Sequence, residues 1–140
     1  MSMHRRDALI EAPVARVWEL VGNPARHPSW WPRIVEVRGE RFEVDDRYVQ
    51  VTTTPTGSHE TTLAVDARHE LREIGMHCLN TGMFARWRLA EARGQTFVEL
   101  DLGMEPGSPQ MRMFDATVGR LYFRRWAEQS IDALKRAATD

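Results

Sequence analysis

The chain has 140 residues, a formal net charge of −1, 42% hydrophobic and 28% charged residues, and a single cysteine, Cys78. This composition is typical of one globular domain with a sizeable core, and it excludes a disordered chain. The balanced charge argues against a nucleic-acid partner, and a lone cysteine excludes an internal disulfide or a zinc site built from several cysteines.

The hydropathy pattern bears on where the protein works. Residues Met1–Asp7 are polar and lack the apolar core segment of a secretory signal. No stretch approaches the roughly 20 apolar residues of a membrane span. We therefore expect a cytoplasmic protein without stable membrane insertion.

The first part of the chain predicts one strand and two short helices. Arg5–Glu11 is expected to form a strand, which Pro13 ends. Apolar residues three and four apart predict an amphipathic helix over Val14–Val21. Asn23 is expected to cap a second, short helix over Pro24–Ser29.

Residues 34–104 show the pattern of β-strands. Short turns between consecutive strands imply antiparallel neighbours. Residues 96–102 alternate clearly between apolar and polar, which predicts one buried and one exposed face. The expected strands are Ile34–Arg41 continued by Phe42–Val44 after a bend at Gly39, then Tyr48–Thr54, Glu60–Asp66, Leu71–Leu79, Met83–Glu91 and Thr96–Leu102.

The last part of the chain predicts one long helix over Gln110–Ala138. It contains no proline and one glycine, Gly119, and would make about seven to eight turns at 3.6 residues each. A slowly drifting stripe is expected to face the sheet: Met111, Phe114, Val118, Tyr122, Trp126, Ser130, Ala133 and Ala137.

This order of elements predicts a cavity. A single antiparallel sheet needs its apolar face covered, and only the C-terminal helix is long enough to do so. A helix about 10 Å across is too narrow to cover a curved sheet of six or seven strands. We therefore expect an apolar cavity with an entrance between the sheet and the long helix.

The opening of the chain resembles a known superfamily. The segments Ile10–Leu20, Asn23-Pro24 and Trp30-Trp31-Pro32 look like the START-like superfamily, which includes pollen-allergen-type proteins and polyketide cyclases/dehydrases. Two stretches, Arg72 with His77 and Thr81–Phe84, and Met104–Pro109, are similar to single-domain aromatase/cyclases of aromatic polyketide pathways.

The resemblance covers essentially the whole chain, so it implies one domain over residues 1–140. It implies an α+β helix-grip fold: a curved antiparallel sheet of about seven strands around a long C-terminal helix, with an internal ligand cavity. Roles in the superfamily range from cyclisation and dehydration to carriage of lipids or hormones. The aromatase/cyclases usually have an arginine on a central strand that points into the cavity, and Glu60–Asp66 contains none.

Aromatic and apolar side chains on the expected inner faces are the candidates for ligand contact. Trp30 and Trp31 would border the entrance, or else anchor the short helix to the sheet. Trp87 is the best wall candidate, because a buried indole N–H needs a partner. On the strand over Tyr48–Thr54, either Tyr48 or its neighbours Val49 and Val51 face inward. For every candidate the alternative to ligand contact is ordinary packing in the core. The candidate set is Trp30, Trp31, Tyr48, Leu63, Val65, Met83, Trp87, Met111, Phe114 and Val118.

Ionisable groups are sparse in the expected interior. His59 shares the phase of the inward residues of its strand and is a candidate for proton transfer, or else a solvated turn residue. Tyr122 is a candidate for polarising a ligand carbonyl, or else a core tyrosine with a backbone partner. The five histidines are scattered, so we expect no metal site, and no motif predicts a cofactor.

The leading hypothesis is a protein that binds a hydrophobic small molecule, such as a polyketide, a lipid or another polycyclic compound. As an enzyme it would promote cyclisation or dehydration by holding a reactive chain folded. One alternative is a non-catalytic carrier or sensor. Another is a protein-interaction module that uses its outer face around Phe84, Arg86 and Arg88. A homodimer is a further alternative for its partner.

Overall fold

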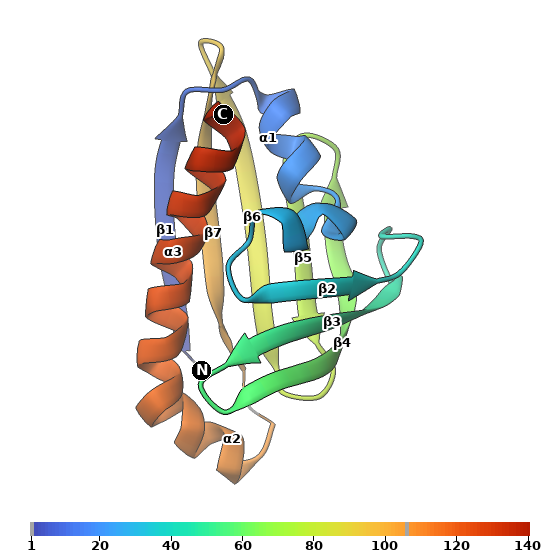
Figure 1. The fold of residues 1–140 in the computed structure, drawn as a ribbon, viewed down its shortest axis with the longest axis vertical. Helices are drawn as coiled ribbons and strands as arrows, with labels where there is room; N and C mark the ends of the chain where they lie inside the picture. Colours follow the sequence, from blue (N-terminus) through green and yellow to red (C-terminus); the bar gives the residue numbers. More distant parts are fainter. Residues whose placement is uncertain (1, 106) are drawn as a thin grey trace.

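The structure, a computed structural model, describes residues 2–105 and 107–140. One seven-stranded sheet has the order β1-β7-β6-β5-β4-β3-β2, and all neighbouring strands are antiparallel (Figure 1). This is the α+β helix-grip fold that the sequence predicts. The strands are β1 Ser2–Ile10, β2 Ile34–Arg38, β3 Arg47–Thr54, β4 Gly57–His69, β5 Glu73–Cys78, β6 Met83–Ala92 and β7 Gln95–Met104.

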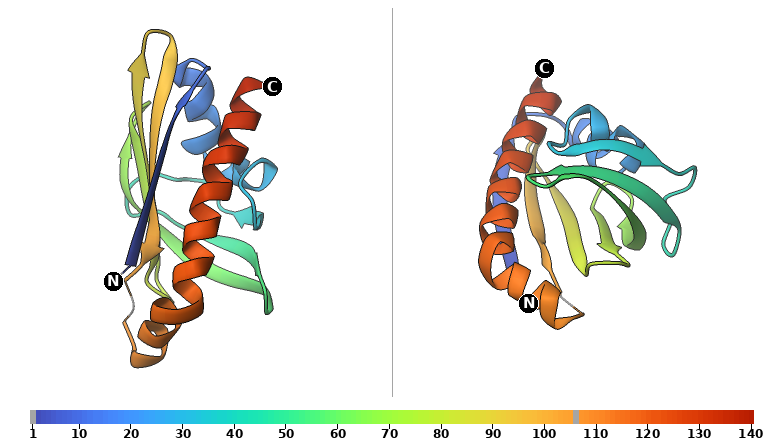
Figure 2. Two further views of the ribbon diagram at one scale, coloured as in Figure 1. Left: turned by 90° about the vertical axis from the view of Figure 1, so that its left-hand side faces the viewer. Right: turned by 60° about the horizontal axis from the view of Figure 1, so that its bottom comes forward.

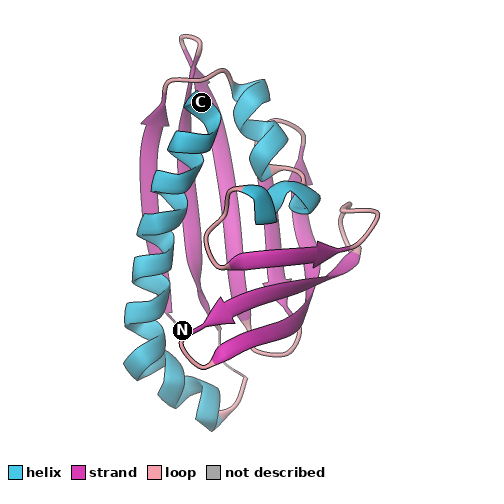
Figure 3. Cartoon of the chain, in the orientation of Figure 1, coloured by secondary structure: helices cyan, strands magenta, loops and turns pink. Residues whose placement is uncertain are grey.

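Two short helices follow β1 as expected. Helix α1 spans Val14–Val21, and the 3-10 helix η1 spans Pro24–Ser29. The side chain of Asn23 accepts a hydrogen bond from the backbone N–H of Ala25, which confirms the predicted cap. All helices lie on one side of the sheet (Figure 3), so the sheet has a covered inner face and an open outer face.

Some predicted strand limits are wrong. β2 ends at Arg38, and residues Phe42–Val44 form no strand. Instead they enter a turn in which Asp45 has a positive φ of 74° and its N–H bonds to the carbonyl of Val65. The apolar residues in this segment imitate a strand, because Phe42 packs against the core from a loop.

The predicted long C-terminal helix is present over residues 109–139, with one irregular turn within it. It begins as α2, Pro109–Phe114, passes through a π-helical turn, Asp115–Gly119, and continues as α3, Arg120–Thr139. A π turn holds one residue more than an α turn, so it rotates the side chains of α2 about the helix axis relative to those of α3. Asp115 and Gly119 are buried there, whereas Phe114 and Val118 are exposed. The predicted stripe is therefore correct in α3, where Trp126, Ser130 and Ala133 are buried, and it loses its phase at the π turn.

The inner face of the sheet and the helices enclose one core. Its largest fully buried side chains include Trp87, Trp126, Leu100 and Leu102. None of the helices in the described part of the chain is long and apolar enough to cross a membrane.

Candidate functional site

The helices cover the inner face unevenly. Helix α3 packs chiefly on β1 and β7, and α1 lies against β6 and β7. The sheet curls, so that β2 and β3 turn across the inner side (Figure 2, right). The cavity that the sequence predicts between sheet and helix would therefore lie over the inner face from β6 to β3.

A cluster of tryptophans lies on this inner face. The rings of Trp30 and Trp31 stack with centroids 5.5 Å apart, and both contact the edge or face of Trp87, at 5.7 and 5.3 Å. Trp31 also contacts Trp126 at 5.8 Å. Trp30 and Trp31 thus anchor the segment after η1 to both the sheet and α3, which corresponds to the packing alternative for these two residues.

Hydrogen bonding distinguishes Trp87 from the other four tryptophans. The indole N–H of Trp30 donates to the carbonyl of Leu20 at 2.9 Å, and that of Trp31 donates to Ser130 Oγ at 2.6 Å. Trp18 and Trp126 donate to Glu70 and to the carbonyl of Pro32, respectively.

The indole N–H of Trp87 has no acceptor among the described residues, although the side chain is fully buried. Leaving a buried donor unpaired costs about 1–3 kcal/mol, and native proteins rarely tolerate it. A donor is therefore available in the middle of the inner face.

Tyr48 points to the inner face, so of the two alternatives for β3 it is Tyr48 and not Val49 and Val51 that faces inward. Tyr48, Gln50 and Thr52 are buried, while Val49 and Val51 are only half-buried. The hydroxyl of Tyr48 also lacks a partner among the described residues. Burial, followed by the negative charge of Asp66, raises the pKa of Tyr48, so the hydroxyl keeps its proton and can donate.

The other predicted wall residues divide into three groups by their burial. Leu63 and Val65 on β4 are each 1% exposed and belong to the packed core. Met83 and Met111 are half-buried and pack against the core from the start of β6 and from α2. Phe114 and Val118 are 39% and 63% exposed, because the π turn rotates them away from the sheet.

The two predicted catalytic residues lie near the β3–β4 hairpin. His59 is exposed, and its Nε2 lies 3.1 Å from Thr56 Oγ1. The Tyr122 hydroxyl lies 3.5 Å from the carbonyl oxygen of Thr53, and the Arg33 guanidinium lies 4.5 Å above the ring. Burial raises the pKa of Tyr122. Both residues are thus close to the same hairpin, and each has a local polar contact.

His27 is a buried histidine that the sequence pattern does not single out. It is fully buried in η1, and its Nε2 lies 2.9 Å from the carbonyl oxygen of Val21. Burial lowers the pKa of His27 to about 4, so the ring is neutral and Nε2–H donates to Val21. Nothing in the surrounding sequence distinguishes this histidine from the exposed ones, so only the structure identifies it.

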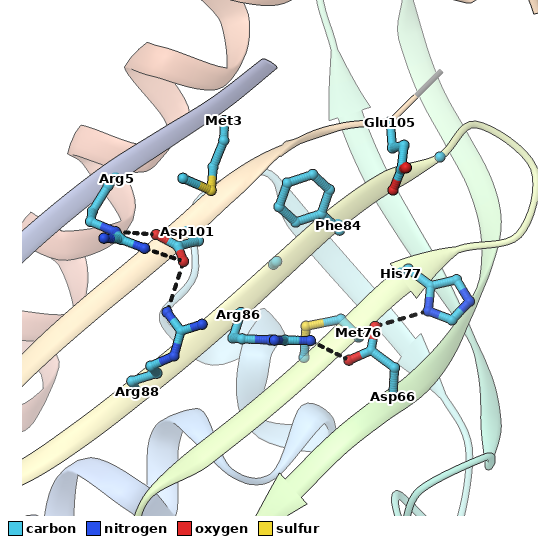
Figure 4. Close-up of a pocket in the computed structure, with 12 residues that line it drawn as sticks. Met3, Arg5, Asp66, Met76, His77, Phe84, Arg86, Arg88, Asp101 and Glu105 are labelled. Carbon is cyan, nitrogen blue, oxygen red and sulfur yellow. Dashed lines mark hydrogen bonds and ion pairs between the residues drawn. The ribbon is translucent and has the colours of Figure 1, made fainter. Parts of the chain in front are cut away.

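A pocket lies on the outer face of the sheet, opposite the inner face on which the sequence predicts a cavity (Figure 4). It has a volume of about 640 Å³ and is crossed by a chain of ion pairs. Arg88 bridges Glu73, Glu99 and Asp101. The chain continues from Arg5 on β1 through Asp101, Arg88, Glu73, Arg86 and Asp66 to His77 on β5. Its arginines point away from the inner face.

Asp101 is the central acid of this chain. Its side chain is 5% exposed and accepts hydrogen bonds from Arg5 at 2.7 and 3.1 Å and from Arg88 at 2.8 Å. Burial pushes the pKa of Asp101 upward, but the bonds from the two arginines outweigh it, and the net pKa is lowered. The outer site is thus a set of charges that neutralise one another.

Among the described residues, no group of three or more His, Cys, Asp or Glu side chains is arranged to hold a metal ion. Cys78 is a free, buried thiol.

Residues 4–139 match the family model described as "Polyketide cyclase / dehydrase and lipid transport". The chain belongs to this family, in agreement with the superfamily resemblance of its sequence. No curated protein matches the chain.

Solved structures share the fold at low sequence identity. The Zhui aromatase/cyclase from a Streptomyces species is 14% identical, with a TM-score of 0.77, and the match covers 99% of this chain and 93% of that one. A protein from Thermus thermophilus is 16% identical, with a TM-score of 0.76 and coverage of 99% and 97%. The di-domain aromatase/cyclase BexL is 20% identical, with a TM-score of 0.75 and coverage of 99% and 47%.

Proposed function

We propose that this protein binds a hydrophobic small molecule that carries a hydrogen-bond acceptor, such as a ketone or hydroxyl, on the inner face of the sheet. The observation that carries this proposal is the fully buried indole N–H of Trp87, which has no acceptor among the described residues. A ligand carbonyl at this position would remove the energetic penalty of the unpaired donor. The rings of Trp30 and Trp31 would supply apolar contact beside it.

The proposed route to this site lies between α2 and the start of β6. Met111 and Met83 lie there and are only half-buried. Methionine side chains change rotamer easily and adapt to ligands of different shape. Because the inner face is otherwise tightly packed, entry of a ligand requires these side chains to move.

Carriage without turnover is the form we favour. His59 is exposed, and the Tyr122 hydroxyl contacts a backbone carbonyl. The description of the family and its aromatase/cyclase neighbours support catalysis as a second candidate. In that case we propose Tyr122 as a donor to a ligand carbonyl and His59 as the group that moves a proton.

We further propose a cytoplasmic location. We also propose that the protein has no nucleic-acid partner, because its net charge is −1.

The first test is native mass spectrometry of the freshly purified protein, followed by denaturing extraction and identification of any released compound. We expect a bound apolar compound. Trp87→Phe should weaken the affinity for the ligand by about two- to tenfold, the equivalent of one hydrogen bond. The smaller ring should also lower thermal stability, because the side chain is fully buried. Trp126→Phe is the matched control, because it removes an indole N–H that is already bonded to Pro32.

The outcomes separate the candidate functions. If Trp87→Phe binds the compound as well as the parent chain does, the indole N–H of Trp87 does not donate a hydrogen bond to the ligand. A compound released unchanged after incubation supports carriage, whereas conversion supports catalysis. If conversion persists fully in both His59→Ala and Tyr122→Phe, these residues are not the catalytic groups. A protein that is always empty but co-precipitates a partner supports the interaction module instead.

A further inference from the structure

Four apolar side chains are exposed on the N-terminal part of the C-terminal helix. Met113 is 72% exposed, Phe114 39%, Val118 63% and Leu121 50%. Val118 follows Phe114 by four residues and Met113 by five, which is the spacing of a π turn, and Leu121 follows Val118 by three. The four side chains therefore lie along one exposed side of the helix and form a ridge. We call these four residues the apolar ridge.

A row of arginines accompanies the apolar ridge. Arg120 and Arg124 are four residues apart on α3 and share one flank of the helix, and Arg112 lies on α2 before the π turn. Arg125 lies at the end of the ridge. All four are exposed, and the only ion pair that any of them makes within the described chain is a long one from Arg124 to Glu128, at 3.9 Å. The one acid among residues 109–125, Asp115, is buried.

This segment differs from the arginines of the outer face. There, Arg5, Arg86 and Arg88 are all paired with carboxylates. On the helix, the positive charge is left largely uncompensated beside exposed apolar surface. An exposed apolar stripe flanked by arginines is the pattern of a helix that lies in the interface of an anionic membrane.

We propose that the apolar ridge and its arginines dock this protein peripherally on an anionic phospholipid surface. Met113, Phe114, Val118 and Leu121 enter the boundary between headgroups and acyl chains, and the arginines contact the phosphates. The proposal does not depend on the inner ligand site, because it uses only the outward side of the helix.

Two other occupants fit the surface less well. A second copy of the chain, packed ridge to ridge, would bring the exposed arginines of both copies together. A protein partner would need a ridge surface with a defined shape and with free polar groups that it could recognise. The ridge presents apolar side chains, and the hydroxyl of Thr117, which lies among them, is already donated to the carbonyl of Met113 at 2.7 Å. A fluid lipid interface requires neither feature.

The test is co-sedimentation of the full chain with vesicles of phosphatidylcholine and phosphatidylglycerol in equal parts, and with phosphatidylcholine alone. We expect binding to the anionic vesicles only, and weaker binding as ionic strength rises. The double variant Arg120→Gln with Arg124→Gln should lower the partition coefficient by about fivefold for each charge. The double variant Met113→Gln with Leu121→Gln should lower it about tenfold or more.

Matched control variants test whether binding depends on the apolar ridge itself or only on the overall charge and hydrophobicity of the protein. Lys135→Gln with Arg136→Gln removes two exposed charges from the far end of the same helix, and Leu9→Gln removes a side chain that is 49% exposed on the outer face. Both should bind as the parent chain does. Circular dichroism verifies that each variant is folded. Absence of binding to anionic vesicles, or equal losses in the control variants, would overturn the proposal, whatever the inner site binds.

Discussion

The two faces of strand β6 have opposite chemistry. Ala85, Trp87 and Leu89 point to the inner face and are buried, whereas Arg86 and Arg88 point to the outer face and join the chain of ion pairs. One strand thus carries a tightly packed apolar surface and a charged surface that is open to solvent (Figure 4).

The difference shows what each face contributes. On the inner face, packing supplies the free energy of folding, because each buried large side chain removes apolar area from water. On the outer face, the charges satisfy one another and contribute little unless they are buried. The N–H of Trp87 stands out because it is a buried polar group without a hydrogen-bond partner among the described residues, on an otherwise apolar, packed face.

The largest expected effect contrasts the two faces of β7. Leu100 is fully buried on the inner face, and Phe97 is 40% exposed on the outer face of the same strand. Leu100→Ala should lower the free energy of unfolding by about 2–5 kcal/mol through lost burial and a cavity. Phe97→Ala should cost far less. Urea unfolding of both variants measures the contrast, and equal losses would show that the faces are not distinct in energy.

The next effect is a dependence on pH that originates under η1. Burial lowers the pKa of His27 to about 4, from 6.5 in the unfolded chain. The unfolded state therefore binds the extra proton first, and stability is full above about pH 6.5 and falls as the pH drops toward 4, by about 3 kcal/mol.

His27→Gln should remove most of this pH dependence, even if the variant is less stable at neutral pH. The residual slope would include His4, whose pKa burial and then Arg6 also lower. His59→Gln, which changes an exposed histidine, is the control and should leave the slope intact. Thermal unfolding across the range from pH 7 to about 4 measures it. A slope unchanged in His27→Gln would contradict the assignment.

A smaller effect concerns the central acid of the outer face. Asp101→Asn removes the negative charge that accepts bonds from Arg5 and Arg88. Because the pKa of Asp101 is lowered in the folded state, its stabilisation is present above about pH 4 and is lost as the pH falls further. Asp101→Asn should therefore be less stable than the parent chain at pH 7, and this difference should shrink in acid. The exposed Asp132→Asn is the control.

Much of the fold could be predicted from the sequence, because local periodicity encodes it. The alternation in Thr96–Leu102 and the helical spacing in Val14–Val21 both correspond to observed elements. The strand predicted at Phe42–Val44 is wrong, because apolar residues in a core-packed loop look like a strand. The π turn escapes prediction, because nothing in the periodicity of residues 109–139 marks the inserted residue that exposes Phe114 and Val118.

The candidate site is predictable only in part. That Trp87 is buried and in need of a partner follows from its phase and its indole, but the four satisfied tryptophans become distinguishable from it only once their acceptors are placed. Acceptors such as the carbonyl of Leu20 or Pro32 come from the backbone, and sequence patterns do not show where a carbonyl points. The partner of His27 is hidden from the sequence for the same reason.

The smallest expected effect compares two arginines in matched positions. Arg86 and Arg88 share strand and face, with side chains 38% and 39% exposed. Arg86 contacts Asp66 and Glu73, which retain 32% and 22% of their exposure, so water can solvate them when the arginine is lost. Arg86→Gln should therefore change the free energy of unfolding by less than about 1 kcal/mol.

Arg88→Gln should cost more than Arg86→Gln, because Arg88 contacts three carboxylates and one of them, Asp101, is only 5% exposed. After the substitution Arg5 alone would compensate that nearly buried charge. High salt should shrink the small loss in Arg86→Gln and leave most of the loss in Arg88→Gln, since buried pairs are screened less. Urea unfolding at two ionic strengths measures this. If the two variants respond alike, burial of Asp101 does not set the strength of the outer chain of ion pairs.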